Sequence, residues 1–156
     1  MSHVVDVHTV GVRVPLARRD VAGIARLVLR AEKVGRARVS IAFVDDTRIA
    51  RLNRRHLGHH GPTDVISFAL PDESEGVVGD IYIAPGVARR NAAERGIPIR
   101  HELARLVVHG VLHVVGYDHP EGAGRYESRM WTRQEQLVRK IVRRPAAART
   151  RPRSAA

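Results

Sequence analysis

The stretch from Pro98 to Gly116 constrains the fold most strongly, because it predicts one long helix with an apolar stripe that has to be buried. Proline is tolerated where a helix begins, and glycine is common just beyond a helix end. The spacing of the apolar residues between these two positions matches one face of a helix. This apolar stripe comprises Leu103, Leu106, Val107, Val111 and Val114. The sequence therefore predicts a helix over 98–115 that is anchored in the core.

Histidines lie on another face of this predicted helix. His109 and His113 are four residues apart, so their imidazoles project from one face at adjacent turns. Gly116 allows a chain reversal with positive φ, which would bring His119 back toward that face. Three imidazoles with a fourth position open to water are typical of a catalytic zinc site. The spacing predicts one zinc ion per chain, held by His109, His113 and His119, with His109 counted among the catalytic residues as well.

The composition narrows the choice of metal ligands and of cellular compartment. The chain contains no cysteine, which excludes disulfides and thiolate metal sites and leaves histidine and carboxylate as ligands. Its N-terminus does not resemble a signal peptide, and no apolar run approaches the roughly 18 residues of a membrane span. We therefore expect a cytoplasmic protein with no membrane partner.

The formal net charge is +11, and its distribution divides the chain in two. Seven basic residues and no acidic ones lie from Arg139 onward. The rest of the chain therefore contains 20 of the 27 basic residues and all 16 acidic ones. A basic tail raises non-specific affinity for nucleic acid, but it is equally typical of a solvated segment in an arginine-rich protein. We expect a single catalytic domain over 1–142 and a basic, disordered tail over 143–156.

Strand and helix patterns are interleaved along the rest of the chain. Strands are predicted over 4–14, 38–43, 65–70 and 77–83. Helices are predicted over 21–34, 47–56, 85–96 and 125–143, in addition to the helix over 98–115. The order has no strict βαβ rhythm. The pattern therefore predicts a single α+β domain, with a short mixed β-sheet packed against helices and a metalloprotease-like zinc helix.

The spacing H-x-x-x-H-x-x-G-x-x-H is also that of the metzincin proteases, which carry glutamate directly after the first histidine. That glutamate acts as the general base, and losing such a group costs on the order of 10²–10⁴-fold in rate. Gly110 occupies the position here. A zinc peptidase or another zinc metallohydrolase is therefore an alternative function that the residue after His109 disfavours.

The segment HGVLHVVGYDH over 109–119 resembles the signature of the YbeY family of metal-dependent endoribonucleases. Further segments recur in this family in the same order: Leu52-Asn53, Pro62-Thr63-Asp64-Val65-Ile66-Ser67-Phe68, Gly79-Asp80-Ile81 and His101-Glu102-Leu103. The resemblance covers roughly residues 40–142, and the first 35 residues match only in outline. As a set, these motifs are highly specific.

The resemblance implies a small α+β fold in which three histidines hold a zinc ion in a cleft, and these map onto His109, His113 and His119. It implies cleavage of single-stranded RNA, with roles in maturing the 3′ end of small-subunit rRNA and in ribosome quality control. The implied partners are single-stranded RNA, rRNA and the ribosome or its small subunit. The oligomeric state does not follow from the sequence.

One position departs from the family pattern. The family usually has an arginine five residues before the Pro-Thr-Asp segment, where this chain has Leu57. We hypothesise that Arg54 or Arg55, both close by in sequence, supplies the missing positive charge as a catalytic residue. Such a group would stabilise the charge that develops on the oxygens around phosphorus. A third candidate function, favoured by Leu57, is a ribosome-binding factor whose zinc is largely structural.

Several acidic or histidine positions have both a functional and a structural interpretation. Asp118 is a candidate catalytic residue that could orient a zinc ligand or accept a proton, although aspartate in a turn favours a structural role. Asp64 could face the cleft or fix the loop before a strand. Asp80 is expected at a solvent-facing edge, and His59 and His60 in an exposed loop.

The remaining candidates are expected to be structural. Glu102 lies on the same helical face as His109, but a surface ion pair with Arg105, three residues on, is the expected role. Tyr126, Met130 and Trp131 lie on the last predicted helix and are expected to make core contacts.

Overall fold

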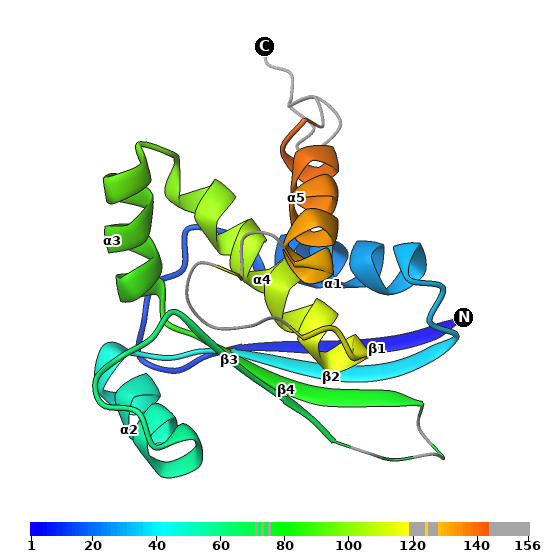
Figure 1. Cartoon of the computed structure of the whole chain (residues 1–156), viewed down its shortest axis with the longest axis horizontal. Coiled ribbons are helices and arrows are strands. Elements are labelled where there is room, and N and C mark those ends of the chain that lie inside the picture. The colour runs from blue at the N-terminus through cyan, green and yellow to red at the C-terminus, as the bar shows by residue number, and fades with distance from the viewer. Residues whose placement is uncertain (71, 73, 75, 119–123, 125–127, 144–156) are drawn as a thin grey trace.

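A four-stranded mixed β-sheet lies at the centre of the fold in the computed structural model, which describes residues 1–70, 72, 74, 76–118, 124 and 128–143 (Figure 1). The strands are β1 (Ser2–Thr9), β2 (Arg36–Phe43), β3 (Val65–Ala69) and β4 (Val77–Ile83), in the order β1-β2-β4-β3. β1 and β4 pair with β2 in parallel, and β3 pairs with β4 in antiparallel orientation. The predicted mixed sheet and α+β class are confirmed.

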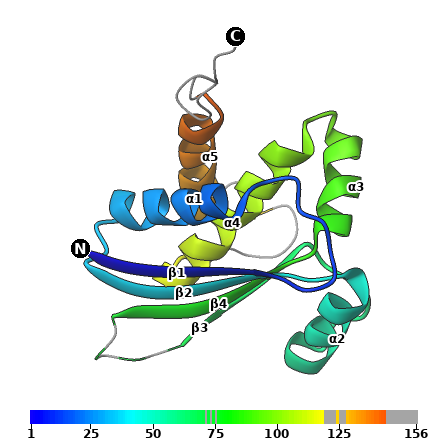
Figure 2. The ribbon, with the colours of Figure 1, turned by 180° about the vertical axis from the view of Figure 1, so that it is seen from behind.

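Helices cover the two faces of this sheet unequally. α1 (Arg18–Ala31), α3 (Pro85–Arg95), α4 (Ile99–Val115) and α5 (Arg129–Val142) lie on one side, and α2 (Asp46–Leu57) lies on the other (Figures 1 and 2). The alternation in β2 explains the arrangement, since Ala37, Val39, Ile41 and Phe43 are buried toward the main helical layer. A smaller apolar cluster, formed by Val44, Ile49, Ile66 and Ala84, holds α2 against the sheet.

The helix α4 packs against the sheet and is buried on most of its surface. All five residues of the predicted apolar stripe are buried, as the sequence indicates. Two glycines allow the close approach of α4 to β4. A Cβ at Gly79 would lie 2.5 Å from Val114 Cγ1, and one at Gly110 would lie 2.7 Å from Ile81 Cγ2. The position of α4 is therefore fixed by direct contact with the central part of the sheet.

The boundaries of several elements differ from the predicted ones. β1 ends at Thr9 rather than near 14, because its partner strand β2 ends at Phe43, the residue that pairs with Thr9. α1 begins at Arg18, before the predicted residue 21, because its first turn is charged and exposed and adds nothing to the apolar pattern. α5 begins at Arg129, where the Ser128 side chain caps the helix by accepting from the Trp131 N–H at 3.1 Å. Residues 125–127 of the predicted helix lie outside the described residues.

The sequence-based expectations for the periphery are the absence of membrane-spanning segments and a disordered C-terminal tail. Within the described residues, no helix is long and apolar enough to cross a lipid bilayer. The predicted tail begins at residue 143, the last described residue, and 144–156 lie outside the described part of the chain. The expectation of disorder for that tail stays a prediction.

Candidate functional site

The structure brings His109 and His113 together on α4. Their ring centroids are 4.8 Å apart and the ring planes meet at 77°. Two imidazoles bound to one tetrahedral zinc ion through bonds of about 2.0–2.1 Å have centroids roughly 5 Å apart. The observed spacing therefore fits a shared metal ion without a change of helix geometry. Among the described residues no group of three potential ligands occurs, and His119, the third predicted ligand, lies outside them.

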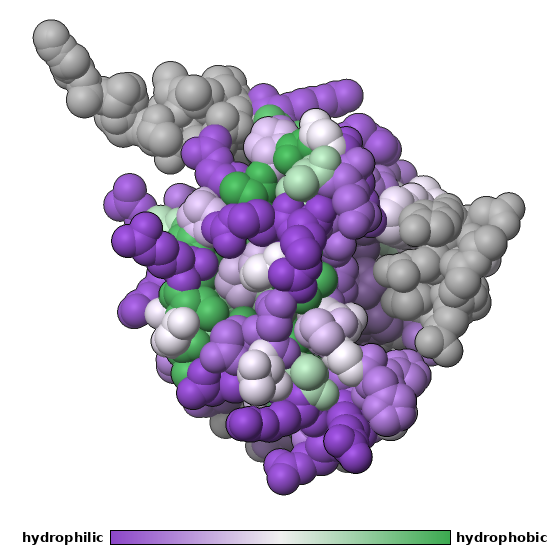
Figure 3. Space-filling view, turned by 90° about the vertical axis from the view of Figure 1, so that its left-hand side faces the viewer, coloured by the Kyte–Doolittle hydropathy of each residue, from purple (hydrophilic) through white to green (hydrophobic). Residues whose placement is uncertain are grey.

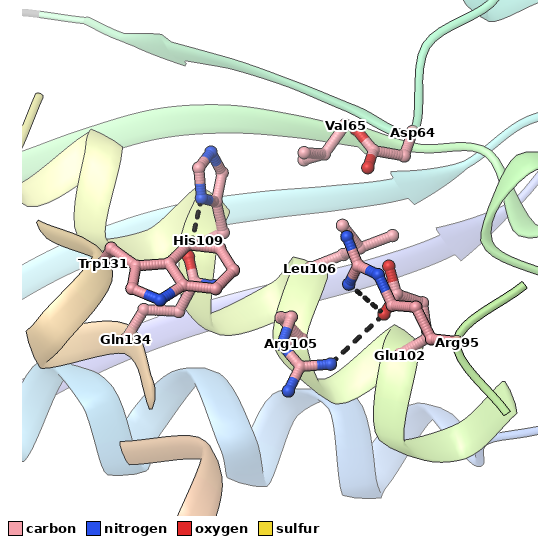
Figure 4. A pocket seen from close by; sticks show the side chains of 9 residues that line it. All are labelled: Asp64, Val65, Arg95, Glu102, Arg105, Leu106, His109, Trp131 and Gln134. Atoms are coloured by element: carbon pink, nitrogen blue, oxygen red, sulfur yellow. Dashed lines mark hydrogen bonds and ion pairs between the residues drawn. The ribbon is translucent and has the colours of Figure 1, made fainter. Parts of the chain in front are cut away.

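The orientation of His109 is fixed by a residue of α5. The imidazole is 9% exposed, and its Nδ1 lies 2.7 Å from Oε1 of Gln134, which is 1% exposed (Figure 4). The amide orientation of Gln134 is itself defined, because its Nε2 donates to Oε2 of Glu135 at 3.0 Å. A carboxylate only accepts, so Oε1 of Gln134 must accept from His109 Nδ1–H. This tautomer leaves the lone pair on Nε2 of His109 available to a metal ion.

Ion pairs extend from Gln134 along α4. Arg105 binds Glu135 with two hydrogen bonds of 2.9 Å, a bidentate geometry that favours both charged forms. Burial alone raises the pKa of Glu135, but hydrogen bonds from Arg105 and Gln134 outweigh it and hold the pKa below its ordinary value. The pKa of Arg105 is raised, mainly by the hydrogen bond to Glu135. Both groups therefore stay charged at neutral pH and give Gln134 a fixed anionic partner.

Glu102 continues this ion-pair network toward α3. It accepts from Arg105 at 3.2 Å and from Arg95 at 3.0 Å, and its side chain is 1% exposed. The expected ion pair with Arg105 is confirmed, but the expected surface position is wrong. Glu102 is buried because α3 packs against the first turns of α4 and brings Arg95 over the carboxylate. A buried carboxylate is tolerated here because two guanidinium groups offset the cost of removing it from water.

A small pocket opens beside these groups, with His109, Gln134 and Trp131 at one end and the Arg95–Glu102–Arg105 ion pairs at the other (Figure 4). Val65, the first residue of β3, and Asp64 just before it line its opposite wall. The Asp64 carboxylate accepts from Asn91 of α3 at 3.3 Å. Its backbone carbonyl also accepts from Ala84 at 3.0 Å. Asp64 therefore both faces the pocket and fixes the loop, the two roles that the sequence left open.

The chain segment that follows α4 is tied to α1 and α5. The Tyr117 hydroxyl donates to Glu32 Oε1 at 2.7 Å, and Arg133 Nε donates to the other oxygen of Glu32 at 2.6 Å. The hydrogen bond to Glu32 is the main cause of a raised Tyr117 pKa. Gly116 has φ of 126°, which permits the predicted reversal. These contacts hold the backbone just before Asp118, which is exposed.

Arg54 and Arg55 do not lie in the His109 pocket. Both are exposed on α2, which lies on the other side of the sheet from α4 (Figures 1 and 2). They line hollows other than the His109 pocket: both line one hollow, and Arg54 also lines a second. Asp118 is likewise absent from the described lining of the pocket. His109 and His113 thus lie next to each other on α4, whereas the two candidate arginines lie outside the His109 pocket. The hypothesis that Arg54 or Arg55 replaces the family arginine next to the metal has no support from this placement.

Other predicted positions have mixed outcomes. Asp80 was expected at a solvent-facing edge, but β4 lies between β2 and β3, so this residue is half-buried on a central strand. His59 and His60 are exposed, as expected. Met130 is a buried core residue, whereas Trp131 is half-buried and lines the pocket. Tyr126 lies outside the described residues.

Gln134 is the functional candidate that the sequence reasoning missed. The signal was present, since Gln134 interrupts the apolar stripe of α5 formed by Met130, Leu137, Val138 and Ile141. A polar residue inside an apolar stripe has to find a hydrogen-bond partner in the core. Such a partner must come from a neighbouring helix, and α4 is the helix that supplies it.

The glycine after His109 bears directly on the peptidase alternative. The Cβ position of Gly110 points at Ile81 of β4, with Cγ2 at 2.7 Å and Cδ1 at 3.0 Å. A side chain at this position would enter the contact between α4 and the sheet and would not face the pocket. Position 110 therefore cannot supply the general base that glutamate supplies in the metzincin pattern.

Comparisons with known proteins agree with this architecture. A family model described as Endoribonuclease YbeY matches residues 8–142. The Endoribonuclease YbeY of Pelotomaculum thermopropionicum is 43% identical over 122 residues, which cover 73% of this chain and 78% of that protein. That of Micrococcus luteus is 40% identical over 123 residues, covering 74% and 77%.

A solved structure supports the same relationship at the level of the fold. The solution structure of TM1509 from Thermotoga maritima has a TM-score of 0.61 and 26% sequence identity, and the match covers 97% of this chain and 99% of that one. Family membership supports a nuclease that acts on RNA. From the signature helix α4, the sheet that it packs against and the match over 8–142, we conclude that this chain belongs to the YbeY endoribonuclease family.

Proposed function

We propose that the chain is a zinc-dependent endoribonuclease that cleaves single-stranded RNA. Its substrate would be rRNA, with a role in maturing the 3′ end of small-subunit rRNA and in ribosome quality control, in contact with the small subunit in the cytoplasm. The observation that carries the metal dependence is the pair His109 and His113, spaced for one ion, with His109 held by Gln134 in the tautomer that a metal requires.

The proposed centre contains one zinc ion held by His109, His113 and His119. Bound zinc would supply Lewis acidity at a phosphoryl oxygen and lower the pKa of water toward neutrality. The protein's own contribution is positioning. Gln134 fixes the ring of His109, and the partly buried network of Glu135, Arg105 and Glu102 holds Gln134 in place. In a site preorganised in this way, no free energy is lost in reorienting these groups during the reaction.

Gln134→Leu is expected to weaken zinc binding by about 10–100-fold, because losing a hydrogen-bond partner of a ligating histidine typically has that effect. Leucine has a similar volume but cannot accept from His109 Nδ1–H. The measurement is competition for zinc against a chromophoric chelator. Gln136→Leu, at an exposed position of the same helix, is the matched control and should leave the zinc affinity unchanged. Equal affinities for wild type and Gln134→Leu would contradict the positioning role.

The proposed function is tested with labelled single-stranded RNA, the same RNA in a duplex, and an unstructured protein such as casein. We expect zinc-dependent internal cleavage of the single strand, little cleavage of the duplex, and no proteolysis, with chelator abolishing activity. Proteolysis without RNA cleavage would favour the peptidase alternative. Stoichiometric zinc without either activity, together with co-sedimentation with small ribosomal subunits, would favour the ribosome-binding factor.

A further inference from the structure

Three arginines on α2 have no acidic partner among the described residues. Arg51, Arg54 and Arg55 are all exposed, and their spacing of three and four residues places them on one side of the helix. Two other arginines near the same helix are neutralised, Arg48 by Asp45 at 2.6 Å and Arg90 by Asp46 at 2.7 Å. Unpaired guanidinium groups in one cluster present several donors to an anion. This side of the molecule is largely hydrophilic (Figure 3).

A groove runs between α2 and the loop that follows it. On the helix side this hollow of about 420 Å³ is lined by Arg51 and Arg54 together with Asp46, Thr47 and Ala50, and on the loop side by His60, Gly61 and Pro62. The Asp46 carboxylate is paired with Arg90 at 2.7 Å. The loop is fixed against the helix, because Asn53 Nδ2 donates to the Gly61 carbonyl at 3.0 Å and Asn53 is 4% exposed. A second hollow of about 580 Å³ also has Arg51 and Arg54 in its wall, together with Arg55. Arg51 and Arg54 therefore contribute to the walls of both hollows.

The same loop connects this groove with the His109 pocket. His60, Gly61 and Pro62 line the groove, and Asp64 and Val65 line the pocket. From Pro62 to Asp64 the chain spans at most about 7 Å, since a residue extends the backbone by at most about 3.6 Å. An extended polyanion lying in the groove could therefore follow the loop around the end of the sheet and enter the pocket, although α2 and α4 lie on opposite faces.

We propose that the groove between α2 and residues 60–62, named here the α2 groove, binds the sugar–phosphate backbone of the RNA substrate a few nucleotides from the phosphate that is cut. Arg51 and Arg54 bind its phosphates, since the planar guanidinium matches phosphate oxygens with two hydrogen bonds. A single strand fits such a path because it can bend around the loop, which a stiff duplex does not do at this scale. The inference rests on the proposed function for the location of the cut. It gives Arg54 a role in substrate binding at a distance from the metal.

The test compares two double variants of the full chain. Arg51→Gln/Arg54→Gln removes two charges from the α2 groove, and Arg18→Gln/Arg19→Gln removes two charges from exposed positions at the start of α1. Binding of a fluorescent 20-nucleotide RNA is measured by anisotropy with chelator present, so that no cleavage occurs, over a series of salt concentrations. Cleavage of the 20-nucleotide RNA and of a tetranucleotide is then measured with zinc.

The α2 groove variant should bind the long RNA about tenfold more weakly than wild type, and the slope of log K against log salt should fall by about 1.4, or about 0.7 for each lost phosphate contact. Its KM for the long RNA should rise while kcat stays unchanged. Its cleavage of the tetranucleotide, which is too short to occupy both sites, should match wild type. The α1 variant should retain wild-type affinity for the long RNA.

Equal affinity and salt slope for wild type and the α2 groove variant would overturn the proposal, even if zinc-dependent cleavage is intact. Equal losses in the two double variants would also overturn it, because the effect would then follow net charge alone. Salt-dependent binding that is lost only in the α2 groove variant, in a protein that does not cleave RNA, would support the groove and contradict the proposed function. The two failures are therefore distinguishable.

Discussion

Replacing His113 by alanine is expected to abolish zinc-dependent cleavage of RNA while leaving the protein folded. The ring lies beside that of His109, so its removal takes away one of the two imidazoles on α4 that are proposed to bind the metal. A metal ion contributes several kcal/mol of transition-state stabilisation, and losing about 4 kcal/mol corresponds to a rate loss of about 10³-fold. His113 is only half-buried and is not part of the apolar core, so we expect a change in Tm of a few degrees at most.

The experiment compares wild type, His113→Ala and His8→Ala, an exposed histidine on β1, on one labelled single-stranded RNA. The control should cleave as wild type does, and His113→Ala should show no cleavage above background with or without added zinc. Thermal unfolding of all three proteins confirms that the comparison is between folded proteins. Wild-type cleavage by His113→Ala would assign the observed activity to a contaminating nuclease and would remove support for the metal centre.

Gly110→Glu, which restores the glutamate of the metzincin pattern, is expected to unfold or severely destabilise the protein and to create no peptidase. The new side chain would start 2.7 Å from Ile81 Cγ2, inside the contact between α4 and β4, and would bury an unpaired carboxylate. We expect a loss of more than about 4 kcal/mol in the free energy of unfolding. Gly110→Ala should cost about 1–3 kcal/mol from overpacking alone.

Gly23→Ala is the matched control for this pair, because Gly23 also lies in a helix but a Cβ there would meet nothing within 4 Å. It should stabilise the protein by up to about 1 kcal/mol, the difference in helix propensity between glycine and alanine. Urea unfolding measures all three variants. A folded Gly110→Glu protein that hydrolyses casein would contradict the assignment of this position to helix–sheet packing.

The sequence predicts the fold well where periodicity and burial coincide. The apolar stripe of α4 is buried as expected, and its ends at Pro98 and Gly116 follow from the properties of proline and glycine. Boundaries were missed where charged residues form the ends of elements, as at Arg18, because an exposed turn leaves no apolar pattern. The end of β1 depends on the length of its partner strand, which the residues of β1 alone do not reveal.

The candidate site was predictable only within a single element. The spacing of His109 and His113 is a local property of one helix, and the structure retains it. Gln134 and Arg95 come from two other helices, α5 and α3, that tertiary packing brings to the pocket, so no local spacing pointed to them. Arg54 and Arg55 lie on α2 and do not line the His109 pocket, and their catalytic role stays a prediction. Proximity in sequence to the Pro-Thr-Asp segment does not tell on which face of the sheet α2 packs.

One zinc ion bound at α4 is proposed to support cleavage of RNA by this chain. The most direct test is to remove metal from the wild-type protein, add zinc in measured steps, and follow the cleavage rate of a labelled single-stranded RNA together with bound zinc. The rate should rise in proportion to bound zinc and reach its plateau at one zinc per chain. Full activity in the metal-free protein, or a plateau of bound zinc reached without any cleavage, would contradict this proposal.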